Sequence, residues 1–121
     1  MEQIRQGDVL LVCVAALPEG IQEQPRKDGL IVLAYGEVTG HAHAIAEPDV
    51  KWFGAANGQQ YLESAKPFML KHGELAALIH AREAGAEVAG SDHAAQRFAP
   101  GVWMVVHQYE YEAEQLRQVM D

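Results

Sequence analysis

The sequence predicts a mainly β protein, a small antiparallel barrel or sandwich with one helix inserted around residues 74–87. Short apolar runs rich in β-branched residues recur at close spacing along the chain. Gly, Pro and Asn-Gly turn signals separate these runs, and one stretch rich in Ala and Leu interrupts the series. With 121 residues the chain is long enough for one hydrophobic core, so we expect a single domain over residues 1–121.

The first half of the chain gives two strands joined by a polar connection. Residues 9–15 are aliphatic and β-favouring, which suits a buried strand. Residues 21–29 are polar and contain Pro25, so we expect an exposed connection or a weak edge strand there. Asp28-Gly29 is a hairpin signal, and the strand that follows it should cover residues 30–35.

The groups best able to do chemistry lie in residues 36–45, which read Gly-Glu-Val-Thr-Gly-His-Ala-His-Ala-Ile. His41 and His43 are separated by one residue, so in a strand both imidazoles project from the same face. Ala42 and Ala44 would then occupy the opposite face, where their small size would let another layer come close.

The second half continues as an antiparallel meander and then changes character. Three further short strands are expected at residues 50–53, 59–64 and 67–70. Asn57-Gly58 is the strongest hairpin signal in the chain. Residues 74–87 favour a helix of about three turns. Residues 92–99 are polar and give no clear pattern, and a last strand should cover residues 102–111, with His107 on the face of Trp103 and Val105.

Composition excludes several classes of partner. The formal charge is -8 and the nine Lys and Arg residues are scattered, which argues against nucleic acid. Cys13 is the only cysteine, so no intramolecular disulfide can form and a reducing cytoplasm is the expected setting. No apolar run is long enough to span a bilayer, and residues 9–17 read as a buried strand rather than a signal peptide. Self-association into a homo-oligomer would hide the edges of such a sheet.

The His-x-His pair at residues 41–43 is the strongest chemical signal. Imidazole is a common ligand of divalent transition metals, and we expect Zn, Fe, Ni or Mn as the cofactor. The third ligand would be His93 or His72, with Glu47 as a carboxylate alternative. Glu37 and Glu47 could each be a ligand, an orienting partner or the general base, and Glu37 is the candidate catalytic residue. The alternative is a pair of half-buried strand histidines that serve structure alone.

The residues around this pair resemble the first motif of the cupin superfamily. The resemblance is carried by Gly36, His41, His43, Glu47 and Gly54. Cupins are double-stranded β-barrels, and the resemblance implies a cupin-like fold with the two histidines and the glutamate as metal ligands. A second cupin motif, Pro-x-Gly-x-x-His, supplies one more histidine in that superfamily, and this chain departs from it.

A second resemblance covers nearly the whole length. It is carried, in this order, by residues 6–11, 33–45 and 108–111, and it includes the sequence Gly-Glu-Val-Thr-Gly-His-Ala-His. The chain is similar to a family of small uncharacterised bacterial proteins, which implies no particular activity. The resemblance implies a common site built from His41, His43, His72 and His93, and an insertion at residues 75–90.

Two functions from different classes follow. The first is a metal-binding β protein, in which the ion would act as a Lewis acid or activate water if the protein is an enzyme. The second is a non-enzymatic barrel that binds a protein or acts as an oligomeric accessory, with structural histidines. A metal site requires deprotonated imidazoles and loses its ion below about pH 6, whereas a packing role need not respond to a chelator.

Overall fold

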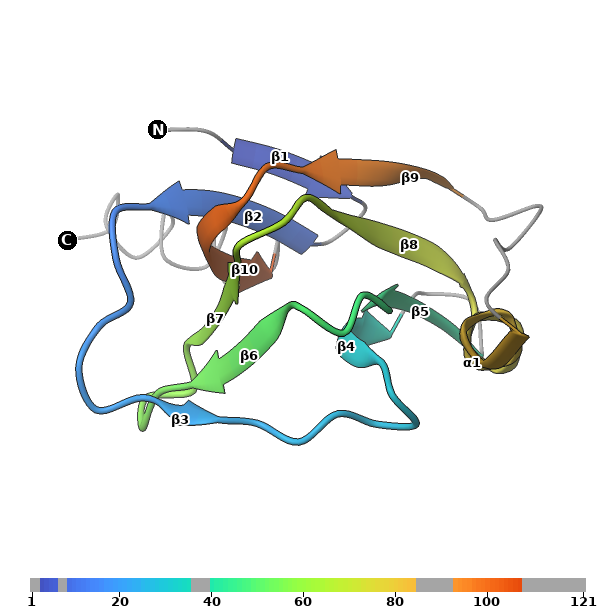
Figure 1. Cartoon of the computed structure of the whole chain (residues 1–121), viewed down its shortest axis with the longest axis horizontal. Helices are drawn as coiled ribbons and strands as arrows, with labels where there is room; N and C mark the ends of the chain where they lie inside the picture. The colour runs from blue at the N-terminus through green and yellow to red at the C-terminus, as the bar shows by residue number, and fades with distance from the viewer. Residues whose placement is uncertain (1–2, 7–8, 36–39, 85–92, 108–121) are drawn as a thin grey trace, which may run out of the picture.

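The computed structural model describes residues 3–6, 9–35, 40–84 and 93–107. These residues form ten strands and one helix (Figure 1). The elements are β1 Gln3–Gln6, β2 Val9–Val14, β3 Gln22–Glu23, β4 Ile31–Tyr35, β5 His41–Ile45, β6 Lys51–Gly54, β7 Gln60–Ser64, β8 Phe68–Glu74, α1 Leu75–Ala84, β9 His93–Phe98 and β10 Gly101–His107. The mainly β class with one helix is therefore confirmed.

The strands form two antiparallel sheets that remain separate. The six-stranded sheet has the order β1-β2-β10-β7-β6-β3, and the four-stranded sheet has the order β4-β5-β8-β9. Of the two predicted architectures, the described residues therefore adopt the sandwich, since neither sheet closes into a barrel.

The main hydrophobic core is built from both sheets. Its buried residues are Val9, Leu11, Ile31, Leu33, Ile45, Val50, Leu62, Phe68, Leu70, Phe98, Trp103 and Val105. Aromatic rings join the sheets at one place, because Phe98 stacks on Phe68 with centroids 5.2 Å apart and meets Trp103 edge-on at 5.1 Å. The indole N–H of Trp103 donates to the carbonyl of Ala99 at 3.1 Å, so its polar atom is satisfied within the core.

Helix α1 covers the alanine face of β5. It begins directly after β8 and lies beside one end of β5 and β8 (Figure 1). Leu78 packs with Leu30 and Ala44 in a small second cluster, and Ala42 is fully buried on the same face. The close approach expected at the two alanines is therefore confirmed, as is the helix within residues 74–87.

A hairpin forms at each predicted turn, but the second closes between Ala55 and Gln59 and has a longer loop than the two residues Asn57-Gly58. Asp28 and Gly29 have φ values of 52° and 79°, the two positive angles that a type I′ turn requires. The residues that flank them, Lys27 and Leu30, exchange two backbone hydrogen bonds of 2.9 Å. In the second turn Gly58 has φ 88° and donates its N–H to the carbonyl of Ala55 at 2.9 Å.

The predicted meander is wrong where the chain changes sheet, at the steps from β5 to β6 and from β7 to β8. β7 pairs with β6 and β10, whereas β8 pairs with β5 and β9, so the chain passes from one sheet to the other between them. The Ser64 hydroxyl fixes this crossing, since it donates to the carbonyl of Lys66 at 2.7 Å and accepts from its N–H at 3.2 Å. Pro67 follows and limits the backbone further.

Three strands differ from the prediction in extent. Residues 3–6, for which no strand was predicted, form β1, and residues 93–98, which gave no clear pattern, form β9. β8 extends to residue 74 instead of ending at residue 70. β9 and the end of β8 acquire their partners from distant parts of the chain, and a local pattern does not report such pairing, whereas β1 pairs with the adjacent β2.

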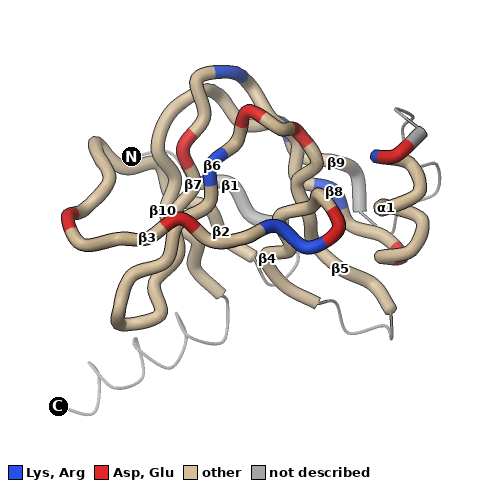
Figure 2. The backbone as a smooth tube through the Cα atoms, turned by 60° about the horizontal axis from the view of Figure 1, so that its bottom comes forward, with Lys and Arg blue, Asp and Glu red and all other residues tan. Residues whose placement is uncertain are grey.

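Figure 2 shows Lys and Arg spread over several elements rather than gathered on one face. Among the helices of the described chain, none is both long enough and apolar enough to cross a membrane.

Candidate histidine site

Three histidines that are far apart in the sequence occupy one row across the four-stranded sheet. In the antiparallel register His43 of β5 lies opposite His72 of β8, and His72 lies opposite His93 of β9. On the other side of β5, Ala34 of β4 pairs with His43 and completes the row. Sheet pairing therefore brings together the backbone positions of three of the four histidines that the sequence singled out.

A β-bulge sets the register of this row. The pairing passes from Leu70–Gln96 to His72–His93, which is two steps along β8 and three along β9. Without the extra residue in β9, His72 would lie opposite Ala94. A second shift of register lies between β4 and β5, on the other side of the row. Bulges of this kind redirect side chains and are frequent beside functional sites.

The histidine row lies on the core side of the sheet. His41, His43 and Ile45 alternate along β5, and Ile45 belongs to the main core. Likewise His72 follows Leu70 by two residues on β8, and Leu70 also belongs to the main core. The apolar interior of the sandwich therefore continues into a group of imidazoles.

The imidazole rings form a compact group. The ring of His43 stacks on that of His72, with centroids 4.1 Å apart and an interplanar angle of 12°. The ring of His41 meets His72 at 5.7 Å and 61°. His43 and His72 are only 3% and 6% exposed, while His41 is half-buried. The group thus has a buried end and a more accessible end.

These ring distances decide what the group can hold. A metal–nitrogen bond of about 2.0–2.1 Å places a ligating ring centroid about 3 Å from the ion, so two ligands of one ion have centroids within about 6 Å. Both separations above satisfy this limit. The rings of His43 and His72 are nearly parallel, and the lone pair of a ring nitrogen lies in the plane of its ring. The two lone pairs therefore cannot point at one ion until one of the rings rotates. Within the described part of the chain, no three His, Cys, Asp or Glu side chains are already arranged as a metal site.

The other predicted site residues have different positions. The carboxylate of Glu47 accepts a hydrogen bond from the backbone N–H of Met69. Met69 precedes His72 by three residues on β8, about 10 Å along a strand, so this carboxylate lies away from the histidine row. Glu37 lies outside the described residues. The backbone of His93 is described, but its side chain lies outside the described part.

The two remaining histidines lie elsewhere. His80 is exposed on α1. His107 ends β10 in the other sheet, opposite Val9, and follows Trp103 and Val105 on the core side.

One residue near the row was missed by sequence reasoning. Glu74 lies directly opposite His41 in the register of β5 and β8, and it is exposed. It follows His72 by two residues, so the two share a face. The His-x-Glu spacing at residues 72–74 was the available signal, and it was overlooked because β8 was expected to end at residue 70.

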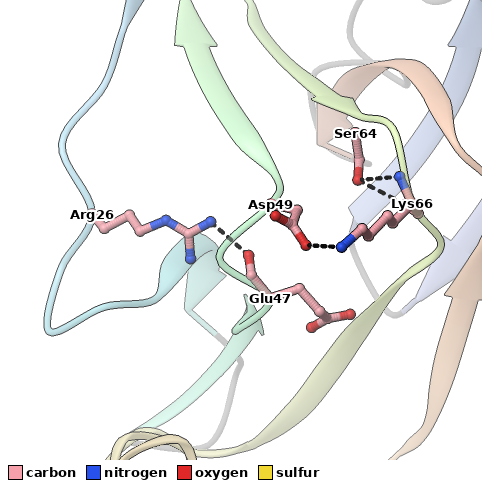
Figure 3. Close-up of polar contacts among 5 residues, drawn as sticks. All are labelled: Arg26, Glu47, Asp49, Ser64 and Lys66. Carbon is pink, nitrogen blue, oxygen red and sulfur yellow. Dashed lines mark hydrogen bonds and ion pairs between the residues drawn. The ribbon is translucent and has the colours of Figure 1, made fainter.

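The backbone carbonyl of Glu47 accepts a hydrogen bond from Arg26. Its guanidinium donates to the backbone carbonyls of Gly29 at 3.0 Å and of Glu47 and Val50 at 2.7 Å each. Figure 3 shows the Glu47 carboxylate directed away from this guanidinium. Burial lowers the pKa of Arg26, nearby Glu47 opposes the shift, and Arg82 adds to it. Glu47 therefore tethers the turn after β5 with both its carbonyl and its carboxylate.

Comparison with family models identifies a family for this chain. No curated protein matches the chain, and no solved structure matches it. The model of one family, described as a domain of unknown function, DUF8820, matches residues 5–108 of the 121. The matched segment includes the described strands β2 to β10 and all four positions of the histidine group. The chain therefore belongs to the DUF8820 family, a domain of unknown function.

Proposed function

We propose that this protein binds a divalent transition metal at the histidine row of β5, β8 and β9. The observation that carries the proposal is the register His43–His72–His93, which puts three imidazole-bearing positions on neighbouring strands. Three histidines with one open coordination position are a common ligand set of catalytic zinc sites, and imidazole also suits Fe and Ni. The ion could be Zn, Fe, Ni or Mn.

The position of the row within the fold supports the proposal. Residues opposite each other in an antiparallel pair have Cβ atoms about 4.5–5.5 Å apart, close enough for both side chains to reach one ion. Strands that are hydrogen-bonded on both sides hold such ligands more rigidly than loops do. β5 and β8 are the two inner strands of their sheet, so His43 and His72 have this support. His41, at the accessible end, is the fourth candidate ligand.

A site of this kind would supply Lewis acidity or an activated water at its open position. The exposure of the residues supports an open position near His41, because His43 and His72 are buried and His41 is partly exposed. A substrate or water molecule would therefore approach from the side of His41.

One observation favours the alternative, a non-enzymatic protein with structural histidines. The nearly parallel rings of His43 and His72 are packed face to face inside the protein. In that case the imidazoles replace apolar side chains in the core, and a chelator would change neither the fold nor its stability.

Metal analysis of untagged protein separates the two functions. The parent, a His43→Gln/His72→Gln double variant and a His80→Gln control would be purified and compared by inductively coupled plasma mass spectrometry. His80 is exposed on α1, so its loss leaves the row intact. We expect nearly one ion per chain in the parent and the control, and none in the double variant, with circular dichroism confirming that all three are folded.

A negative result is also decisive. The metal-free parent would be incubated in turn with Zn²⁺, Fe²⁺, Ni²⁺ and Mn²⁺, the iron under anaerobic conditions. Failure to retain any of the four ions, together with absence of metal in the purified parent, would overturn the metal proposal and favour the structural alternative.

A further inference from the structure

We infer that Glu74 is the carboxylate of the histidine site and that it positions His41. This inference rests on the proposed metal-binding function, and it assigns a site role to a residue that sequence patterns alone did not suggest. It starts from the register, since Glu74 and His41 are direct partners in the pairing of β8 with β5.

The pair forms the last rung of the ladder before the helix. Beyond it, the N–H of Leu75, the first residue of α1, donates to the carbonyl of Gly40 at 2.7 Å. This hydrogen bond holds the two strand ends together where they would otherwise separate. Because paired Cβ atoms lie about 4.5–5.5 Å apart, a glutamate opposite a histidine can reach its ring.

The exposure of the residues gives the pair its place in the site. His43 and His72 are buried, His41 is half-buried and Glu74 is exposed. Among the side chains that the structure describes, the histidine group therefore opens to solvent at the His41–Glu74 rung. A ligating histidine commonly donates its second ring N–H to a carboxylate, which fixes the tautomer and the ring orientation. Glu74 is placed to do this for His41, whose ring meets that of His72 edge-on, whereas the ring of His43 stacks on it.

The other carboxylate considered for this role has a different partner. Glu47 accepts from the N–H of Met69, about 10 Å along β8 from His72. Glu74, by contrast, shares the face of His72 and lies opposite His41. Among the glutamates that the structure describes, the register thus favours Glu74.

The test compares Glu74→Gln with Glu83→Gln. Glu83 is exposed on α1, so its variant removes the same charge away from the row. Zn²⁺ affinity would be measured by competition with a chromophoric chelator. We expect the affinity of Glu74→Gln to fall about 10- to 100-fold and that of Glu83→Gln to stay within about twofold. The metal-free variants should unfold at the temperature of the metal-free parent, which separates the effect from a structural one.

A double-mutant cycle tests whether Glu74 acts through His41. In a His41→Ala background, the further change Glu74→Gln should have no additional effect on Zn²⁺ affinity. An equal loss in both backgrounds would overturn the positioning role, because Glu74 would then act independently of His41.

The failure of the inference differs from the failure of the proposed function. If the parent binds Zn²⁺ and Glu74→Gln binds it equally well, the role of Glu74 is overturned while the metal site stands. If the parent itself binds no ion, the metal site is overturned and the role of Glu74 with it.

Discussion

Arg26 shows how a single side chain can fix the loops on which a site depends. Its guanidinium bonds three backbone carbonyls, and two of them, those of Glu47 and Val50, belong to the turn between β5 and β6. The third, that of Gly29, belongs to the hairpin before β4. The two connections that flank β4 and β5 are therefore held by one cation, and each of the three carbonyls loses this donor if the cation is removed.

We expect Arg26→Ala to lower the free energy of unfolding by about 2–3 kcal/mol, because hydrogen bonds from a charged donor are among the stronger ones. Arg97→Ala is the control, since Arg97 is exposed on β9, and its effect should stay within about 0.5 kcal/mol. Urea unfolding of the metal-free proteins measures both. Equal losses in the two variants would show that charge, and not the three carbonyl contacts, is responsible.

Glu47 is the residue at which the cupin resemblance and the described contacts differ most. As a metal ligand it would need its negative charge, but as an acceptor for the Met69 N–H it needs only an oxygen. We therefore expect Glu47→Gln to keep the metal content of the parent. Glu47→Ala should lose about 1–2 kcal/mol of stability, because the N–H is left without its acceptor. Metal analysis and urea unfolding check the two outcomes. Loss of the ion in Glu47→Gln would show that Glu47 is a metal ligand after all.

At the scale of elements, the success of sequence reasoning depended on how local each feature is. The turn at Asp28-Gly29 and the shared face of His41 and His43 follow from neighbouring residues, and both were predicted. The partner of His43 was not so determined. It depends on β8 lying beside β5, and β8 is joined to β5 through two strands of the other sheet.

The bulge in β9 and the length of β8 could not be predicted from local sequence either, because both depend on pairing with other strands. Residues 71–74 read Lys-His-Gly-Glu, a polar stretch that an isolated pattern does not assign to a strand. They form one because β5 and β9 pair on either side. Glu74 was missed as a consequence, whereas His72 was found through its chemistry and through the resemblance to a family.

Helix α1 allows a prediction at this scale. It is anchored by Leu78 in the small cluster with Leu30 and Ala44. We expect Leu78→Ala to cost about 2–3 kcal/mol and Leu62→Ala, in the main core, to cost at least as much, because the larger core can collapse less around the cavity. His80→Ala, on the exposed face of the helix, should change stability by less than about 0.5 kcal/mol. Urea unfolding ranks the three, and an unchanged Leu78→Ala would mean that the helix contributes no packing energy.

At the scale of the whole molecule, the proposed ion would join strands that the chain order keeps apart. His43, His72 and His93 lie on three adjacent strands, and long stretches of sequence separate the first from the other two. The unfolded chain does not hold these groups together, so an ion that needs all of them binds the folded state far better than the unfolded one. Metal binding should consequently appear as stability of the whole domain, and not only of the sheet that carries the ligands.

The size of this effect follows from mass action. At a free Zn²⁺ concentration about 100 times the dissociation constant, binding to the folded state alone adds about 2.7 kcal/mol. For a domain of this size that corresponds to a rise of about 10 °C in the midpoint of thermal unfolding. The measurement is thermal unfolding monitored by circular dichroism, first with metal-free protein and chelator and then with metal-free protein and Zn²⁺.

The His43→Gln/His72→Gln variant makes this scan specific to the row. We expect it to unfold at one temperature in both conditions, because it lacks the two buried imidazoles that the ion requires. His80→Gln should rise with Zn²⁺ as the parent does. A rise of the same size in the double variant would show that the ion binds elsewhere in the chain. Stabilisation by Zn²⁺ requires binding to the folded state, so it should disappear when two of the ligands are removed.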